Sequence, residues 1–95
     1  MSGAAGADIE GLRARAVDLH RDGRTDAAAA LYAELLAVAP DDLTALHMLG
    51  LIALAGGRAE EARASLSRAT ARYPLIATLH ADLGAAFDAL GMGAE

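Results

Sequence analysis

The sequence predicts an all-α fold in which five helices form antiparallel hairpins that stack on one another. Composition is the first reason, because 26 of the 95 residues are Ala and only three are aromatic. Such a composition suits closely packed helices, whereas a β-sheet favours β-branched and aromatic residues. The second reason is an internal repeat. The third is that, within each repeat, apolar residues recur at helical spacing in segments that Gly and Pro separate. The length fits one small domain.

The repeat is visible at several positions in phase. Gly23, Gly57 and Gly91 are evenly spaced, and the same interval separates Pro40 from Pro74. Further series of similar residues follow this interval: Ala16, Gly50 and Gly84; Leu19, Ala53 and Phe87; Ala28 and Ala62. Because these series agree in phase, the chain is predicted to repeat one helical unit.

The first repeat predicts helices over residues 9–21 and 26–38. Residues 1–8 precede them as a flexible lead-in, since they have neither the basic start nor the apolar stretch of a signal peptide. Pro40 follows the second helix, which it cannot continue.

The second repeat predicts helices over Leu43–Ala55 and Ala59–Arg72. Asp42 is suited to cap the first of these helices. Gly57 is suited to end it, because glycine accepts the left-handed conformation found just past a helix C-terminus. At Gly50, where the two helices cross, a larger side chain would force them apart.

A third repeat is begun but not completed. It predicts a fifth helix over residues 77–90, and residues 93–95 are a short tail. Arrays of this kind generally need about three repeats for stability, so the incomplete one is a candidate for further contacts.

This arrangement resembles the tetratricopeptide repeat (TPR) family, whose unit is a helical hairpin with the same period as this chain. The residues that carry the resemblance are Leu46, Leu49, Gly50, Ala53, Ala62, Leu66 and Pro74 in the second repeat; Leu12, Ala16, Leu19, Ala28, Tyr32 and Pro40 in the first; and His80, Leu83, Gly84 and Phe87 in the third. The resemblance implies a right-handed superhelical stack of about two and a half repeats. The repeats cover residues 9–42, 43–76 and 77–92, within one TPR domain of residues 9–92.

Composition and spacing argue against an enzyme and against several classes of ligand. The formal net charge is −5, whereas nucleic-acid binding needs a clustered positive surface. The chain has no Cys, and its three His lack the i, i+4 spacing that places two metal ligands on one helix face. No catalytic residue, cofactor or metal site is predicted. No stretch is long and apolar enough to span a membrane, and the protein is expected to be soluble and cytoplasmic.

The resemblance implies that the first helix of each hairpin lines a concave groove in which a protein or peptide partner binds. Carried onto this sequence, the groove residues are Arg13, Val17, His20 and Arg21 in the first repeat, Thr44, His47, Met48 and Leu51 in the second, and Asp82 in the third. Their charge runs from basic, through apolar, to acidic, which would complement a partner with the reverse order. The chain is therefore predicted to be a non-catalytic interaction module, a scaffold or adaptor.

Two alternatives remain open. Apolar residues gather near the unfinished third repeat, namely Leu75, Ile76, Leu83, Phe87 and Leu90, and they predict self-association, for example as a homodimer. Residues 40–51 also resemble the N-terminal repeat segments of some bacterial enzymes, among them glycosyltransferases and sulfotransferases. On that interpretation the chain is a docking segment of a larger enzyme.

Overall fold

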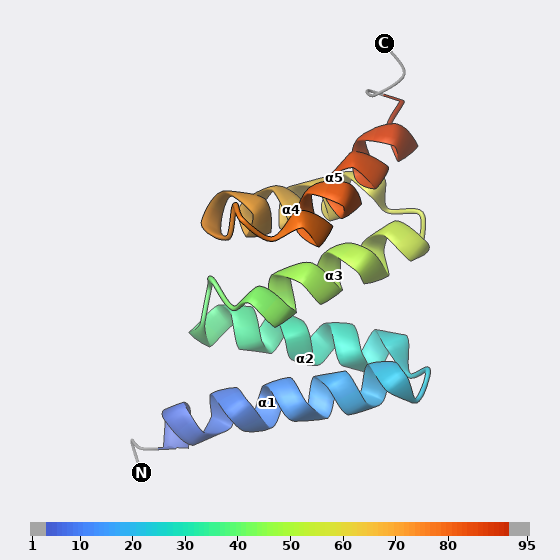
Figure 1. Ribbon diagram of the computed structural model, residues 1–95. Helices are drawn as coiled ribbons and strands as arrows, with labels where there is room; N and C mark the ends of the chain where they lie inside the picture. Colours follow the sequence, from blue (N-terminus) through green and yellow to red (C-terminus); the bar gives the residue numbers. More distant parts are fainter. Residues whose placement is uncertain (1–3, 92–95) are drawn as a thin grey trace.

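Figure 1 shows a computed structural model of the chain, which describes residues 4–91. Five helices follow one another over this range: α1 (Ala4–Arg21), α2 (Thr25–Val38), α3 (Leu43–Ala55), α4 (Ala59–Arg72) and α5 (Ala77–Ala89). The described range contains no strand, so the predicted all-α fold of five helices is confirmed. The predicted tail at residues 93–95 lies outside the described residues, as do the first three residues of the predicted lead-in.

The predicted helix boundaries agree with the structure to within one residue, apart from the start of α1. The bounds of α3 and α4 match, α2 begins one residue earlier at Thr25, and α5 ends one residue earlier at Ala89. In contrast, α1 begins at Ala4. Residues 4–8 therefore belong to the helix and not to a flexible lead-in. Three of these five residues are Ala, the strongest helix former, so the helix extends toward the N-terminus beyond its amphipathic part.

Each helix packs mainly against the next one in sequence, so the chain forms a stack of hairpins (Figure 1). The first hairpin consists of α1 and α2, the second of α3 and α4, and α5 packs on α4. The two hairpins meet where α2 lies against α3, while α3 and α5 touch over a small area. Helix α1 is thus at one end of the stack and α5 at the other.

Glycines end the first helix of each hairpin, as predicted. Gly23 and Gly57 have φ angles of +84° and +81°, in the left-handed region that glycine adopts without a steric penalty. Directly after Gly57, the Arg58 N–H donates a hydrogen bond to the Ala53 carbonyl of α3, at 2.8 Å. The tight turn that results brings α4 back along α3.

The core is thin and consists largely of small side chains. Seven of the thirteen buried apolar residues are Ala. The largest fully buried side chains are Tyr32, Leu35, Leu46, Leu66 and Leu79. They are distributed over three clusters, one centred on the first hairpin and two that join α3, α4 and α5. Since Ala permits close approach of helix axes, small clusters are sufficient to hold the helices together.

The second hairpin depends on a close contact between Gly50 of α3 and Leu66 of α4. A Cβ atom placed on Gly50 would lie 2.6 Å from Leu66 Cγ and 2.9 Å from its Cδ2. Leu66 is fully buried, so its side chain cannot turn out into solvent without losing that burial. Gly84 is the equivalent residue of α5, but a Cβ placed there would meet nothing within 4 Å. The reason is that, within the described residues, the third repeat has no second helix to cover this side of α5.

We predict that the same substitution has opposite effects at these two glycines. Gly50→Ala lowers the free energy of unfolding by about 1–3 kcal/mol, because overpacking outweighs the gain in helix propensity. Gly84→Ala raises it by about 0.5–1 kcal/mol, because the propensity gain is unopposed. Urea denaturation followed by circular dichroism measures both values. Two changes of the same sign would contradict the contact assigned to Gly50.

Candidate binding face

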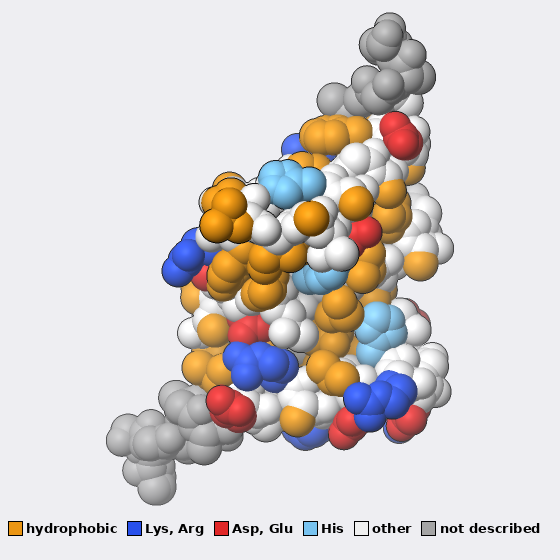
Figure 2. Space-filling model, viewed as in Figure 1, with side chains coloured by type: hydrophobic (Ala, Val, Ile, Leu, Met, Phe, Trp, Pro, Cys, Tyr) orange, Lys and Arg blue, Asp and Glu red, His pale blue; other side chains and the backbone are white. Residues whose placement is uncertain are grey.

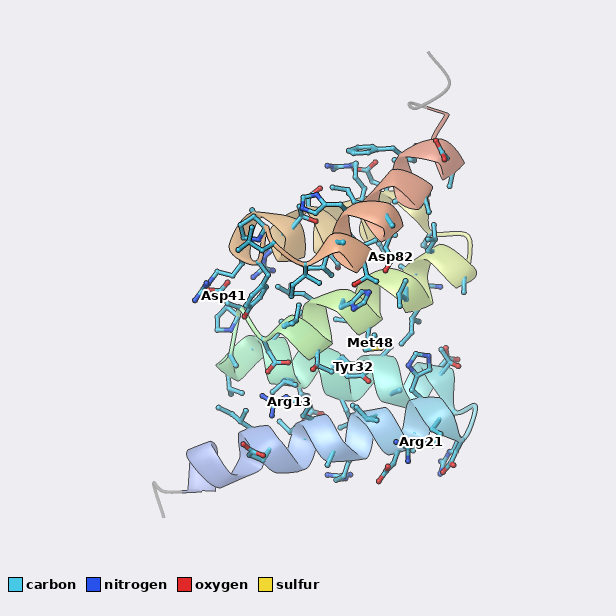
Figure 3. The ribbon with its side chains drawn as sticks, viewed as in Figure 1. Arg13, Arg21, Tyr32, Asp41, Met48 and Asp82 are labelled. Carbon is cyan, nitrogen blue, oxygen red and sulfur yellow. The ribbon has the colours of Figure 1, made fainter. Side chains whose placement is uncertain are left out.

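The binding face is the side of the stack that carries the nine predicted groove residues. These are Arg13, Val17, His20 and Arg21 of α1, Thr44, His47, Met48 and Leu51 of α3, and Asp82 of α5. Arg21 is exposed, and the other eight are half-buried. On this side hydrophobic side chains run across the stack, with His side chains among them (Figure 2). Figure 3 shows Arg13 and Arg21 near α1, Met48 in the middle and Asp82 toward α5.

Four of the groove residues meet in one open pocket, where α1, α2 and α3 come together. The pocket has a volume of about 350 Å³ and is lined by Val17, His20, Arg21 and Met48, together with Tyr32 of α2 (Figure 3). Its walls are aliphatic and aromatic. Two lining residues carry nitrogen side chains, the half-buried His20 and the exposed Arg21. An apolar hollow with a few polar groups is the usual form of a binding pocket.

Tyr32, one of the residues that line this pocket, carries a buried polar atom. Its side chain has no exposed surface, and its hydroxyl has no hydrogen-bond partner among the described residues. The His20 ring packs edge-on against the Tyr32 ring, with 6.5 Å between the centroids. Burial raises the pKa of the Tyr32 hydroxyl, and the charge of Asp42 raises it further. The hydroxyl therefore stays protonated at neutral pH and is available as a donor.

The predicted groove does not include Tyr32, which the sequence analysis names only among the residues that carry the family resemblance. In the structure its ring is fully buried. A comparison between the repeats could have drawn attention to the Tyr32 hydroxyl. Leu66 occupies the equivalent position of the second repeat and is equally buried, but it has no polar atom. A buried tyrosine usually finds a partner for its hydroxyl, so this one is distinctive.

His47 and Asp82 link α3 to α5 across the binding face. The His47 Nε2 lies 2.7 Å from the Asp82 Oδ2, and the two side chains are 21% and 29% exposed. Because α3 and α5 touch over only a small area, this hydrogen bond is a large part of their contact. The Asp82 carboxylate is thus engaged within the chain.

Arg13 is engaged in a similar way by Asp42. Its Nε and Nη2 both donate to Asp42 Oδ1, at 3.2 and 2.5 Å, and this hydrogen bond raises the pKa of Arg13. The other carboxylate oxygen accepts from the Ala45 N–H at 2.9 Å, which confirms the predicted cap of α3. The Asp42 side chain is only 7% exposed, so its charge needs both partners. One aspartate therefore starts α3 and ties it to α1.

Groups from the end of α4 hold the turn between α2 and α3 from the other side. Arg68 donates to the Pro40 carbonyl at 2.7 Å, and the Tyr73 hydroxyl donates to the Asp41 carbonyl. Arg72 Nε also lies 3.4 Å from Asp41 Oδ2. The turn is consequently bound to both hairpins, which fixes their relative position and with it the shape of the pocket.

The charged groove residues that were predicted to contact a partner mostly have partners within the chain itself. Arg13 pairs with Asp42, and Asp82 pairs with His47. Arg21 differs, because its side chain is 71% exposed and its ion pair with the similarly exposed Asp18 is long, at 3.4 Å. Exposed pairs of this kind contribute little stability. Arg21 is thus the groove residue whose charge is most accessible to a partner.

The structure separates the five residues predicted for self-association into two groups. Ile76 and Leu83 pack against the core clusters of the chain itself. Leu75 is 97% exposed, and Phe87 and Leu90 are half-buried at the end of the stack. The apolar surface available to another molecule at this end of the stack therefore centres on the second group, of which Phe87 lies in α5 and Leu75 and Leu90 flank it.

The chemistry that the binding face offers is that of recognition. Its pocket combines aliphatic and aromatic walls with a cation, which suits a polypeptide segment. Among residues 4–91, His, Asp and Glu side chains form no group of three that could hold a metal ion. None of the helices in that range combines the length and hydropathy of a membrane-spanning segment.

Stacked helical hairpins that present a pocket on one face define the chain as a helical-repeat protein. A family model described as tetratricopeptide repeat matches residues 13–75 and again residues 47–92, two matches that begin one repeat apart. The chain belongs to the tetratricopeptide repeat family. Repeats of this family generally mediate protein–protein interaction and are not catalytic. No curated protein and no solved structure matches the chain.

We predict that the two groove arginines differ in their contribution to stability. Arg13→Ala lowers the free energy of unfolding by about 1–2 kcal/mol, because it removes a charged hydrogen bond from a nearly buried carboxylate. Arg21→Ala changes it by less than about 0.5 kcal/mol, because an exposed pair is lost. Urea denaturation distinguishes the two variants, and equal losses would show that Asp42 does not need Arg13.

Proposed function

We propose that the chain is a non-catalytic interaction module that binds a segment of a partner protein on its binding face. The observation that supports this most is the convergence of Val17, Met48 and Tyr32 in one open apolar pocket. Apolar pockets of this kind receive the anchor side chains of a partner, which carry most of the binding energy. Membership of a family of interaction modules supports the proposal in general terms.

The internal ion pairs restrict the chemistry of the partner. Since Arg13 already pairs with Asp42, and Asp82 is already hydrogen-bonded to His47, complementary charges on a ligand would gain little there. The bound segment is thus anchored by the pocket and crosses α3 toward α5, with Arg21 as its charged contact. This differs from the partner that the sequence predicts, whose charge would run along the whole groove in the reverse order of the groove residues.

A docking role for a larger enzyme, such as a glycosyltransferase or a sulfotransferase, is a narrower form of the same proposal. It uses the same binding face, with another part of that enzyme or its protein substrate as the partner.

We place the module in the cytoplasm, as the sequence predicts.

The proposal predicts that Met48→Glu weakens binding of peptides selected against the chain from a random library. The expected loss is at least tenfold in Kd, or ~1.4 kcal/mol, because a carboxylate then occupies the apolar wall. Fluorescence anisotropy with labelled peptides measures the affinities. Ala30→Glu, at an exposed position of α2 outside this pocket, is the matched control and leaves them unchanged. Unaltered binding by a folded Met48→Glu variant would remove the pocket from the proposal.

Self-association is a second candidate function, which the outer side of α5 favours. In the second hairpin Leu66 fills the space beside Gly50, whereas the space beside Gly84 is open. Leu19 and Ala53 pack into the core clusters, but Phe87, at the equivalent position, belongs to none of them. We infer that a helix of a second copy would cover this side of α5, with Leu75 at the edge of the contact.

This second candidate predicts a mass above 9.6 kDa that rises with concentration toward twice that value. Leu75→Glu restores the monomer mass without unfolding the chain, because the side chain is 97% exposed. Val38→Glu, at the other exposed large hydrophobic residue, has no effect on the mass. Light scattering coupled to size exclusion measures all three proteins. A constant 9.6 kDa for the unmodified chain would exclude this function.

A further inference from the structure

The Tyr32 hydroxyl is a buried donor that the fold does not use. A buried hydroxyl without a partner destabilises the fold, because its hydrogen bonds to water are lost and not replaced. Leu66, at the same repeat position of the second hairpin, is fully buried and carries no polar atom, so packing at this position does not require one. Because the hydroxyl has no partner among the described residues and belongs to a residue that lines an open pocket, it points to a ligand.

The surroundings of the hydroxyl indicate what that ligand carries. Val17 and Met48 provide aliphatic walls, and Arg21 provides a cation, while none of the five lining residues is acidic. The nearby carboxylate whose charge acts on the hydroxyl, that of Asp42, is paired with Arg13. The Arg21 guanidinium can exchange its long, exposed contact with Asp18 for a better one at little cost. The pocket thus combines two donors with apolar walls, which suits acceptor oxygens at the end of an aliphatic stem.

We propose that this pocket takes a glutamate side chain of the partner, whose carboxylate accepts hydrogen bonds from the Tyr32 hydroxyl and the Arg21 guanidinium. Its methylene groups lie against Val17 and Met48. The proposal rests on the proposed function, because it names the anchor of the segment that the binding face binds. A cavity of about 350 Å³ has room for one such side chain and the adjoining backbone.

Two further observations agree with this ligand. The Tyr32 hydroxyl is neutral at neutral pH, and burial raises its pKa further, so it can donate a hydrogen bond to a carboxylate. The hydroxyl is also closed to solvent, so a lining side chain must move when the ligand enters. Met48 is suited to this movement, because it is unbranched and flexible.

The test uses short alanine-based peptides, acetylated and amidated, that differ only in one central residue: Glu, Gln or Lys. Blocked termini make the side chain the one carboxylate in the probe. In NMR titrations we expect the Glu peptide to shift the amide signals of Val17, Tyr32 and Met48. It should bind about tenfold more tightly than the Gln peptide, or ~1.4 kcal/mol, and the Lys peptide should leave these signals in place.

Two variants separate recognition from stability. Tyr32→Phe weakens binding of the Glu peptide about tenfold, while the urea midpoint of the chain stays the same or rises, because no hydrogen bond within the fold is lost. A structural role for the hydroxyl would lower the midpoint. Arg21→Gln weakens binding to a similar degree. Arg24→Gln, which removes the same charge from an exposed turn residue outside the pocket, does not.

Each outcome decides between the two proposals. Equal shifts with the Glu and Lys peptides, or undiminished Glu binding by Tyr32→Phe, overturn the glutamate site. If library-selected peptides bind the binding face and also bind Tyr32→Phe as tightly as the unmodified chain, the glutamate site is wrong and the proposed function stands. If neither the defined nor the selected peptides shift signals of the binding face, both proposals are wrong.

Discussion

The contact of Leu66 with Gly50 sets the distance between α3 and α4, and the rest of the stack depends on that distance. Most of the buried residues around it are Ala, whose side chains fill the core only when the helices are close together. A wider separation would leave gaps that no neighbouring side chain is long enough to fill. The small domain has a correspondingly narrow margin of stability, because few large side chains contribute to burial. Because the core has so few large side chains, the stability of the domain depends strongly on the packing at Gly50.

The position of one hairpin relative to the other has a different physical origin, which is polar. Asp42 caps α3 and pairs with Arg13 of α1, while Arg68 and Tyr73 of α4 bind the backbone of the same turn. The pocket lies between α1, α2 and α3, so its shape depends on this junction. A residue such as Arg13 therefore serves the binding face by positioning it, without contact to a ligand. The charges that remain accessible are few, which makes the pocket and Arg21 the distinctive features of the face.

The features that the sequence predicted well are those that local chain chemistry determines. Gly57 requires its left-handed conformation whatever surrounds it, and Asp42 caps a helix by bonding to its own segment. The start of α1 was placed too late because amphipathic spacing ends near residue 9, while a run of Ala continues the helix without any pattern. The pairing of His47 with Asp82 was not predictable, because it joins residues 35 positions apart whose distance depends on how the hairpins stack.

The role of Tyr32 was hidden for a related reason. The repeat places Tyr32 and Leu66 at equivalent positions, and both side chains are fully buried. It does not show whether a polar atom at the end of the Tyr32 ring finds a partner, because the partner would come from another element or another molecule. Only the three-dimensional arrangement shows the hydroxyl unpaired in a residue that lines an open pocket. The four groove residues that share this pocket were predicted individually, but their convergence was not.

The central claim is that a partner segment binds in the pocket between α1, α2 and α3. The most direct measurement is a set of intermolecular NOEs between the chain and a peptide selected against it. We predict contacts from the peptide to the methyl groups of Val17 and Met48 and to the Tyr32 ring. Contacts confined to the outer side of α5, at Leu75 and Phe87, would contradict the claim and would make the end of the stack the site of interaction.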